Sequence, residues 1–359
     1  MDKKVRRILV IRPEKMGDLV VATPVFRAIK ESFPDYGLDL LTDEFSASVV
    51  QSDPYLDKII RIPWSASNPR ERASFFDLYG LLHREGPYEK ALVLYANHDL
   101  WNWVLALNGV REVSQIGGTV SAKLLGHSCV LRNGYTSGKH MSQLFLDVAG
   151  RIGAETKNPL PELYVSDSER KAIATKFPFL RSGNNILLHP FSLTATANLS
   201  PASYMNLSLE LANYSDRNFF LIGTAKEAEA IEIPDHPRIS KALLGQLSIR
   251  ELMAAITHAD LVMGGSSGIV HLAAALSTPT LGFYCPHAHH DEVWGPLGPF
   301  TKTLTVPKEQ CHRVGGGCSK CQGNVEGVFC DIAFAFSAEA VAVEIERLTN
   351  ARRATSTRS

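Results

Sequence analysis

Short, mostly apolar runs alternate with longer segments of helical periodicity along the chain. The first half contains such runs at 8–11, 38–41, 59–62 and 91–94. Runs of this length are typical of strands buried on both faces of a parallel sheet. Between the first two, apolar residues from Leu19 to Phe33 recur at largely helical spacing, and Pro34 ends that helix. Strands that alternate with helices predict right-handed crossovers and a mostly parallel sheet.

The same alternation restarts in the second half, after a proline-bearing stretch without periodicity at 158–167. The pattern there predicts strands at 185–189, 219–223, 261–263 and 280–283, and helices at 249–258 and 268–276. A final amphipathic helix is expected at 338–348, followed by a frayed polar tail at 351–359. The sequence therefore predicts an α/β fold with two Rossmann-like, doubly wound domains. Two such domains facing a central cleft would bind ligands at the carboxyl ends of their strands.

The composition is that of a globular protein with a substantial core, with 45% hydrophobic residues in a chain of 359. Lys+Arg and Asp+Glu both number 37, and this zero net charge argues against a nucleic-acid-binding protein. The N-terminal apolar run is too short for a signal peptide, and no stretch approaches the roughly 20 apolar residues of a membrane helix. We expect a cytoplasmic protein, with at most loose peripheral attachment to the inner face of the cytoplasmic membrane.

The turn after the first predicted strand carries the first candidate for catalysis. It runs from Arg12 to Asp18 and contains a single glycine, Gly17, where a dinucleotide-dependent oxidoreductase would place G-x-G-x-x-G. This argues against such an enzyme and puts Asp18 at the carboxyl end of a strand. A carboxylate at a helix start is also a common cap and a favourable partner of the helix dipole, so a purely structural role for Asp18 is left open.

Motifs are spread in order over most of the chain. The N-terminal ones are I-L-V-I-R at 8–12, M-G-D-L-V at 16–20, A-T-P-V at 22–25 and R-A-I-K at 27–30. Then come G-K-H at 138–140, L-L-H-P at 187–190, L-I-G at 221–223, A-D-L-V at 259–262, S-S-G-I-V-H-L-A-A-A at 266–275 and W-G-P at 294–296. Together they closely resemble glycosyltransferase family nine, the lipopolysaccharide heptosyltransferase family.

The resemblance implies a GT-B architecture with an acceptor-binding domain at 1–165, a nucleotide-sugar-binding domain at 166–335, and a last helix with its tail at 336–359 that crosses back to the first domain. It implies inverting transfer of a sugar, usually heptose from ADP-heptose, onto a lipopolysaccharide core or related lipid-linked glycan. Asp18 would be the general base, because a positioned carboxylate can take the proton of a sugar hydroxyl. No cofactor would be required if helix termini and polar side chains neutralise the leaving diphosphate.

The resemblance also assigns ligand-binding candidates, with two departures from the family pattern. The donor-side candidates are Ser192, Thr194, Thr196, Glu227, Ser266, Ser267, Gly268 and His271, and the phosphate or acceptor-side candidates are Arg12, Lys15, Gly17 and His140. Ser266 stands where the family usually has aspartate, and 192–201 lacks the usual phosphate-binding cation. The hydroxyls of 192–201 remain as phosphate ligands, and either a cation such as Lys15 or Arg12 substitutes for the missing one or donor binding is weaker. Plain capping would also explain the serine pair, a solvated helix face would explain Glu227, and His271 would equally serve to tie the loop to its helix.

Cysteine and histidine clusters raise the question of a metal. The close group Cys311, Cys318, Cys321 and Cys330 is compatible with a structural zinc site or with free thiols. A second group, His287, His289, His290 and Asp291, is expected to be polar lining near a ligand rather than a metal centre.

Two further classes of function are compatible with the sequence. The missing cation and Ser266 would suit a diverged GT-B-fold protein that binds or scaffolds without catalysing transfer. A sugar epimerase or phosphorylase is supported by fold analogy alone.

Overall fold

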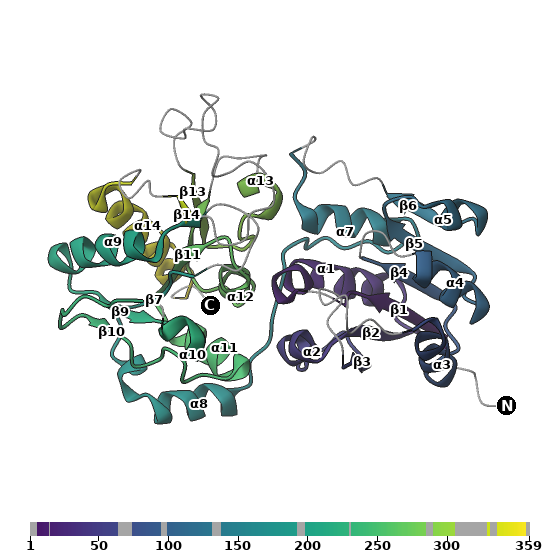
Figure 1. Ribbon diagram of the computed structural model, residues 1–359, viewed down its shortest axis with the longest axis horizontal. Coiled ribbons are helices and arrows are strands. Elements are labelled where there is room, and N and C mark those ends of the chain that lie inside the picture. Colours follow the sequence, from purple (N-terminus) through teal and green to yellow (C-terminus); the bar gives the residue numbers. More distant parts are fainter. Residues whose placement is uncertain are drawn as a thin grey trace. The chain divides into compact units, whose positions relative to one another are not determined.

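The computed structural model describes residues 6–13, 15–63, 74–94, 99–130, 138–191, 198–229, 231–284, 290–305, 329–330 and 336–356. The chain divides into two compact units, Met1–Tyr164 and Val165–Ser359 (Figure 1). The division falls inside the expected linker. Within the described residues, no helix combines the length and the apolar content needed to cross a bilayer.

The first unit is built on a six-stranded parallel sheet in the order β3-β2-β1-β4-β5-β6. Its strands are β1 (Arg7–Ile11), β2 (Gly37–Asp43), β3 (Lys58–Ile62), β4 (Lys90–Val93), β5 (Glu112–Ile116) and β6 (Ser128–Val130). The apolar runs predict β1 to β4. They miss β5, because it buries the polar residues Ser114 and Gln115 and so has no continuous apolar run.

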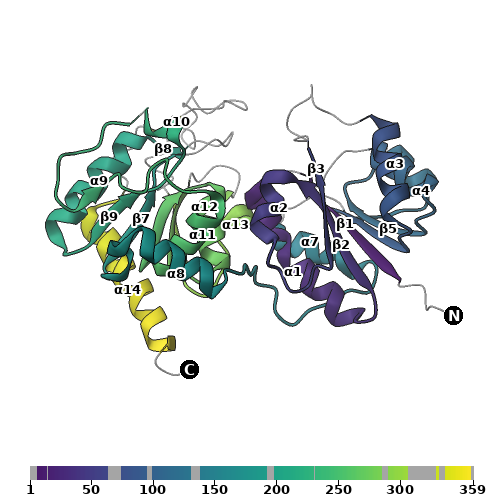
Figure 2. The same ribbon diagram turned by 90° about the horizontal axis from the view of Figure 1, so that it is seen from below.

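Helices cover both faces of this sheet. Two views show α1 (Met16–Ser32), α2 (Glu44–Val50) and α7 (Met141–Gly150) on one face, and α3 (Phe75–Glu85) and α4 (Asp99–Leu107) on the other (Figures 1 and 2). The short helix α5 (Val120–Leu124) packs beside α4. Leu78, Leu82, Val104 and Leu105 of α3 and α4 belong to one buried cluster with residues of β1 to β5.

Helix α1 contains Pro24 without ending there. A proline has no N–H, so the carbonyl oxygen of Val20, four residues earlier, loses its usual donor. The hydroxyl of Thr23 donates to that oxygen instead, at 2.8 Å. The helix therefore stays intact around the proline. It also begins at Met16, three residues before the start that its apolar periodicity predicts.

The second unit repeats the strand order of the first. Its parallel sheet runs β10-β9-β7-β11-β12-β13, formed by β7 (Asn185–His189), β9 (Asn218–Leu221), β10 (Ile239–Ser240), β11 (Leu261–Gly265), β12 (Thr280–Tyr284) and β13 (Thr301–Thr305). A separate pair joins β8 (Asn198–Leu199) to β14 (Phe329–Cys330). The sequence misses β10, which is very short, and β13, whose residues are half-buried and mostly polar.

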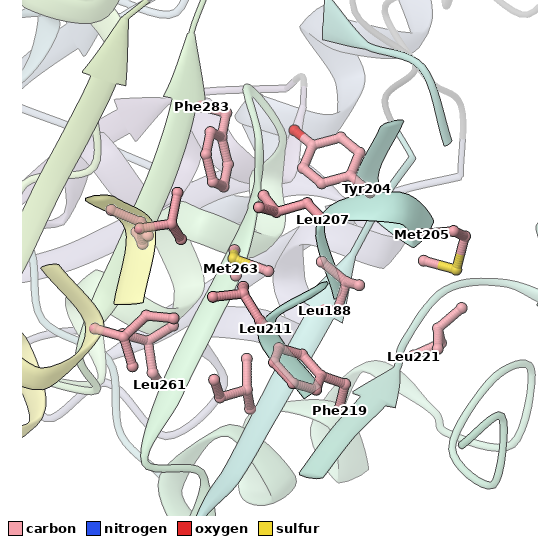
Figure 3. Packing of buried hydrophobic residues seen from close by; sticks show 14 of the residues in the cluster. Leu188, Tyr204, Met205, Leu207, Leu211, Phe219, Leu221, Leu261, Met263 and Phe283 are labelled. Carbon is pink, nitrogen blue, oxygen red and sulfur yellow. The ribbon is translucent and has the colours of Figure 1, made fainter. Parts of the chain in front are cut away.

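Alternate residues of these strands form the core under α9 (Pro201–Tyr214) and α14 (Ala338–Ser356). Leu188, Phe219, Leu221, Leu261, Met263 and Phe283 of the sheet meet Tyr204, Met205, Leu207 and Leu211 of α9 (Figure 3). The unit also contains α8 (Asp167–Lys176), the 3-10 helix η2 (Pro178–Arg181), α10 (Ala225–Ala228), α11 (Ile249–His258), α12 (Gly268–Ala275) and α13 (His290–Trp294). Two-residue periodicity thus gives each strand one face for α9 and α14 and another for the opposite layer.

The last helix continues to Ser356, beyond the expected start of a frayed tail at Ala351. Polar contacts with its own unit extend it: Arg352 donates to the carbonyl oxygen of Ala259 at 2.8 Å, and Glu346 forms an ion pair with Arg217. The crossing of this helix back to the first unit stays a prediction.

A buried carboxyl group makes the stability of the first unit depend on pH. Burial raises the pKa of Asp53 to about 7, against the opposing effects of the Tyr55 N–H, which donates to Oδ1 at 2.9 Å, and of the Arg27 charge. A folded-state pKa above the unfolded value means that stability is lost as the pH rises from the unfolded value through the folded one.

We therefore predict that Asp53→Asn reduces the loss of stability between about pH 4 and about pH 8 by at most about 4 kcal/mol. Urea unfolding of wild type and variant at both pH values measures the difference, and Asp35→Asn, an exposed carboxylate of the same unit, is the control. If Asp53→Asn and wild type lose the same stability over this interval, the buried carboxyl is not responsible.

Candidate active and donor-binding sites

The candidate site of each unit lies at the carboxyl end of its central strand, where the loops after neighbouring strands leave the sheet in different directions. In the first unit, β1 lies between β2 and β4, with Ile11 paired to Leu41 on one side and Val93 on the other. In the second unit, β7 lies in the same way between β9 and β11. In such sheets the chain leaves the central strands in opposite directions, and ligands bind at their carboxyl ends.

Asp18 and Arg12 form an ion pair at this point of the first unit. A terminal nitrogen of Arg12 donates to Oδ2 of Asp18, and the other donates to the carbonyl oxygen of Leu94 just after β4, at 2.9 Å. The guanidinium also lies over the ring of Phe145 on α7, 5.6 Å from its centroid. The Arg12 side chain is 5% exposed and that of Asp18 is 23% exposed. A cation fixed by three elements therefore holds a carboxylate that solvent can still reach.

The turn between these two residues has an unusual backbone. Lys15 has φ 45° and ψ 113°, and its carbonyl oxygen accepts from the N–H groups of Asp18 (3.0 Å) and Leu19 (3.1 Å). A positive φ at a non-glycine residue costs on the order of 1–3 kcal/mol. The side chain of Lys15 is exposed and Gly17 is half-buried. Arg12, Lys15, Gly17 and Asp18 are thus brought together by one strained turn.

His140 lies on the neighbouring helix rather than in this turn. It is the N-cap of α7, and its Nδ1 accepts from the N–H of Ser142 at 3.1 Å. The same helix carries Phe145 beneath Arg12 and packs against α1. A capping role therefore accounts for one nitrogen of this imidazole.

The serine pair of the second unit lies between β11 and α12. Ser266 and Ser267 are 5% and 8% exposed, and His271, one turn into the helix, is 7% exposed. Ser267 occupies the N-cap position, but its hydroxyl bonds to Nδ1 of His189 (3.2 Å) and to no helix N–H. Ser266 hydrogen-bonds the side chain of Tyr284, at the carboxyl end of β12. Ordinary side-chain capping is therefore not what these two serines do.

His189 is a site residue that sequence patterning does not single out. It ends β7, where it reads as the last residue of a buried strand. Burial lowers its pKa to about 4, although the charge of Glu227 acts in the opposite direction. The imidazole is therefore neutral near pH 7, with Nδ1 on Ser267. The motif L-L-H-P at 187–190 is the one signal in the sequence that marks it.

Glu227 follows β9 and takes part in a capping box. Its Oε2 accepts from the N–H (2.7 Å) and the hydroxyl (2.9 Å) of Thr224, while the Thr224 hydroxyl accepts from the Glu227 N–H. Gly223 just before it is tightly enclosed, because a Cβ there would lie 2.9 Å from the ring of Phe191. The box fixes the carboxylate near His189 at the carboxyl edge of the sheet.

Several predicted residues lie outside the described part of the chain. These are Ser192, Thr194, Thr196, His287, His289, Cys311, Cys318 and Cys321, and the side chains of His290 and Cys330. Asp291, in α13, accepts from the hydroxyl of Thr305 at 2.9 Å. Among the residues that the structure does describe, no group of three or more histidine, cysteine or acidic side chains is arranged to hold a metal ion.

The two sites offer complementary chemistry. The first presents a reachable carboxylate beside a buried cation, which suits proton abstraction. The second presents the N-terminus of α12, two hydroxyls and a neutral imidazole at the carboxyl edge of a parallel sheet, which suits a phosphorylated ligand.

Comparison with known proteins identifies the family of the chain. The family model of glycosyltransferase family 9 (heptosyltransferase) matches residues 138–320. Lipopolysaccharide heptosyltransferase 2 of Salmonella typhimurium is 23% identical over 294 residues, covering 78% of this chain and 83% of that protein.

Solved structures show the same fold. A family 9 glycosyltransferase from Veillonella parvula matches with a TM-score of 0.75 at 15% identity, over 97% of this chain and 98% of that one. ADP-heptose lipopolysaccharide heptosyltransferase II of Escherichia coli matches with a TM-score of 0.73 at 18% identity, over 97% and 99%. The two Rossmann-like units are those of a GT-B fold. The chain therefore belongs to glycosyltransferase family 9, the heptosyltransferase family, and is a glycosyltransferase.

Proposed function

We propose that this glycosyltransferase moves heptose from ADP-heptose onto a lipopolysaccharide core or related lipid-linked glycan, with inversion at the anomeric carbon. The family description and the relatives named as lipopolysaccharide heptosyltransferases support this donor and acceptor. The observation that carries the proposal is the carboxylate of Asp18, held at the carboxyl end of β1 and still 23% exposed. Such an enzyme would work in the cytoplasm, at the inner face of the membrane that holds its acceptor.

In this proposal Asp18 is the general base. An acceptor hydroxyl attacks the anomeric carbon of the donor while Asp18 takes its proton. The bond from that carbon to the diphosphate oxygen breaks, and ADP leaves with the electron pair. A positioned base typically contributes 10²–10⁴-fold to the rate of such a step.

Arg12 would position this base rather than bind phosphate. Its terminal nitrogens contact Asp18 and the Leu94 carbonyl oxygen, and Phe145 lies beneath it. Lys15, whose side chain is exposed, is the better candidate for a phosphate or acceptor contact. Gly17 would let the acceptor approach the backbone, and His140 would line the acceptor side.

The donor would bind in the second unit without a metal. The N-terminus of α12 at Gly268 and the hydroxyls of Ser266 and Ser267 would receive the diphosphate, with His271 beside them. Glu227 would accept from ribose hydroxyls. Ser192, Thr194 and Thr196 would add hydroxyl contacts. A structural zinc at Cys311, Cys318, Cys321 and Cys330 stays an open alternative to free thiols.

The two departures from the family motif compensate each other in charge. The family's aspartate would repel a diphosphate unless a cation balances it, and this chain lacks both the aspartate and that cation. Ser266 therefore removes a negative charge from a site that has lost a positive one. The remaining hydrogen bonds are neutral, and such bonds are about half as strong as charge-assisted ones.

We predict that Asp18→Asn lowers turnover by about two to four orders of magnitude and leaves donor affinity nearly unchanged. Asparagine keeps the shape of the side chain but cannot accept a proton. Steady-state kinetics with ADP-heptose, together with calorimetric titration of ADP, separates the two effects. Turnover near that of wild type would show that Asp18 is not the base.

We predict that Ser266→Asp weakens ADP binding about tenfold, equivalent to about 1.4 kcal/mol, because it restores the negative charge without its cation. Ser266→Asn, which is similar in size but neutral, is the matched control, and adenosine is the uncharged control ligand. Thermal shift with increasing ligand measures both, since a ligand of the native state raises Tm. Tighter ADP binding by Ser266→Asp would contradict the compensation.

If wild type binds neither ADP nor ADP-sugars at millimolar concentration, the chain is a scaffold and not a transferase.

A further inference from the structure

The imidazole of His189 is fixed in position at the end of β7. Successive side chains of a strand point to opposite faces of the sheet, and Leu188 belongs to the core under α9 (Figure 3), so His189 points to the other face. Its strand neighbour is Gly264, where a Cβ would lie 2.9 Å from the His189 carbonyl oxygen. The ring of Phe191 packs edge-on against the imidazole, with the centroids 5.8 Å apart. The imidazole therefore meets Ser267 from a fixed direction.

Helix α12 begins differently from most helices of this chain. In α2, α3, α5, α8, α9, α10 and α11, the N-cap side chain accepts a hydrogen bond from the N–H three residues further on. Ser267 has the extended backbone of such an N-cap, with φ −145° and ψ 162°, but its side chain caps no N–H. The Ser267 hydroxyl bonds instead to Nδ1 of His189, at 3.2 Å.

This bond decides what the start of α12 can offer to a ligand. The first N–H groups of a helix have no acceptor within the helix. If Ser267 were an ordinary cap, its hydroxyl would occupy the N–H of Val270, three residues on. Since Ser267 is held by His189, that N–H receives no bond from it. The histidine thus keeps the hydroxyl away from the backbone groups that attract an anion.

The direction of the bond matters as well. A serine hydroxyl has one hydrogen, and a neutral imidazole donates from one nitrogen and accepts at the other. When Nδ1 of His189 carries the hydrogen, it donates to Ser267 and leaves the hydroxyl hydrogen for a ligand. When Nε2 carries it, the hydroxyl must donate to Nδ1 and faces the ligand with lone pairs only. An ionised phosphate group offers only acceptors, so it is compatible with the first arrangement.

We propose that His189 is a positioning residue of the donor site. Its Nδ1–H holds the Ser267 hydroxyl away from α12, so that the hydroxyl hydrogen and the first N–H groups of the helix both bind the diphosphate of the donor. The inference rests on the proposed function, because it takes that diphosphate as the ligand of α12. It deepens that function by naming the residue that orients the binding groups in a site without its usual cation.

A pair of variants with the same side-chain shape tests this role. In His189→Asn the amide nitrogen takes the place of Nδ1 and can still donate to Ser267, whereas His189→Leu has nearly the same shape and no donor. We expect His189→Leu to lower the affinity for ADP about tenfold or more and His189→Asn to stay within about threefold of wild type, as calorimetric titration measures. Adenosine, which has no phosphate, should bind equally to all three proteins.

A second substitution at Ser267 separates positioning from a purely structural role. In His189→Leu the released hydroxyl turns onto the N–H of Val270 and caps α12. Ser267→Ala removes that hydroxyl and opens the helix again. The double variant should therefore bind ADP like Ser267→Ala alone and more tightly than His189→Leu. A purely structural role for His189 predicts the reverse, because two destabilising changes would weaken binding more than one.

Two controls address charge and the loss of a histidine as such. Burial keeps the His189 imidazole neutral near pH 7 by lowering its pKa to about 4. The ratio of ADP affinities between wild type and His189→Leu should therefore persist at high salt, which would weaken an effect of charge. In the first unit, Nδ1 of His127 also bonds to a side chain, at 3.1 Å from Oδ1 of Asn102. We expect His127→Leu to bind ADP like wild type.

Four outcomes would overturn the role of His189 while wild type still prefers ADP to adenosine. They are unchanged ADP affinity in His189→Leu, equal losses in His189→Leu and His189→Asn, a double variant with Ser267→Ala that binds more weakly than His189→Leu, and a loss that disappears at high salt. If wild type binds ADP no more tightly than adenosine, the proposed donor site fails and this inference fails with it.

Discussion

Parallel pairing of one central strand on both of its edges is the constraint on which the rest of this molecule depends. β1 and β7 each pair with a neighbouring strand on both edges, and the last residues of each strand are buried. A strand held in this way cannot shift without moving its entire side-chain pattern to the wrong face. The backbone that follows it is therefore fixed in position, and after β1 one more hydrogen bond continues the pairing, from the N–H of Arg12 to the carbonyl oxygen of Leu41 at 3.0 Å. Both sites use this rigidity, with Asp18 after β1 and His189 at the end of β7.

Under the proposed function, the same constraint would let an electrically neutral chain bind an anionic ligand. A net charge of zero gives no overall positive field to attract a diphosphate. The fold instead provides local hydrogen-bond donors, namely the N–H groups at the start of α12 and the hydroxyls of Ser266 and Ser267, which do not cap the helix. Burial keeps His189 neutral, so no charge of its own adds to or opposes the ligand. Such a site gains its specificity from the directions of its hydrogen bonds more than from charge.

The sequence predicts the strands and helices that can be recognised from the pattern of their own residues. Apolar runs predict the central strands of both sheets, and a regular apolar period predicts α11 with the bounds that the structure shows. β5 and β13 are not predictable in this way, because Ser114 and Gln115 are buried by neighbours distant in sequence and β13 is a half-buried edge strand. The candidate site shows the same division. The turn that contains Asp18 is evident from the residue order, but the ion pair with Arg12 depends on the positive φ of Lys15 and on contacts from β4 and α7.

The two faces of the first unit's sheet carry different features. The face covered by α1 and α7 holds Asp18, Arg12 and Phe145, while the opposite face carries α3 and α4 and continues into α5. A rigid parallel sheet lies between them, so a substitution on the outer side of α4 has no route to the Asp18 carboxylate except through several buried strands. The exposed side chains on the outer side of these helices lie outside that closely packed layer. Because these side chains are exposed and their helices lie across the sheet from α1, we expect their substitution to leave the chemistry of the proposed Asp18 site unchanged.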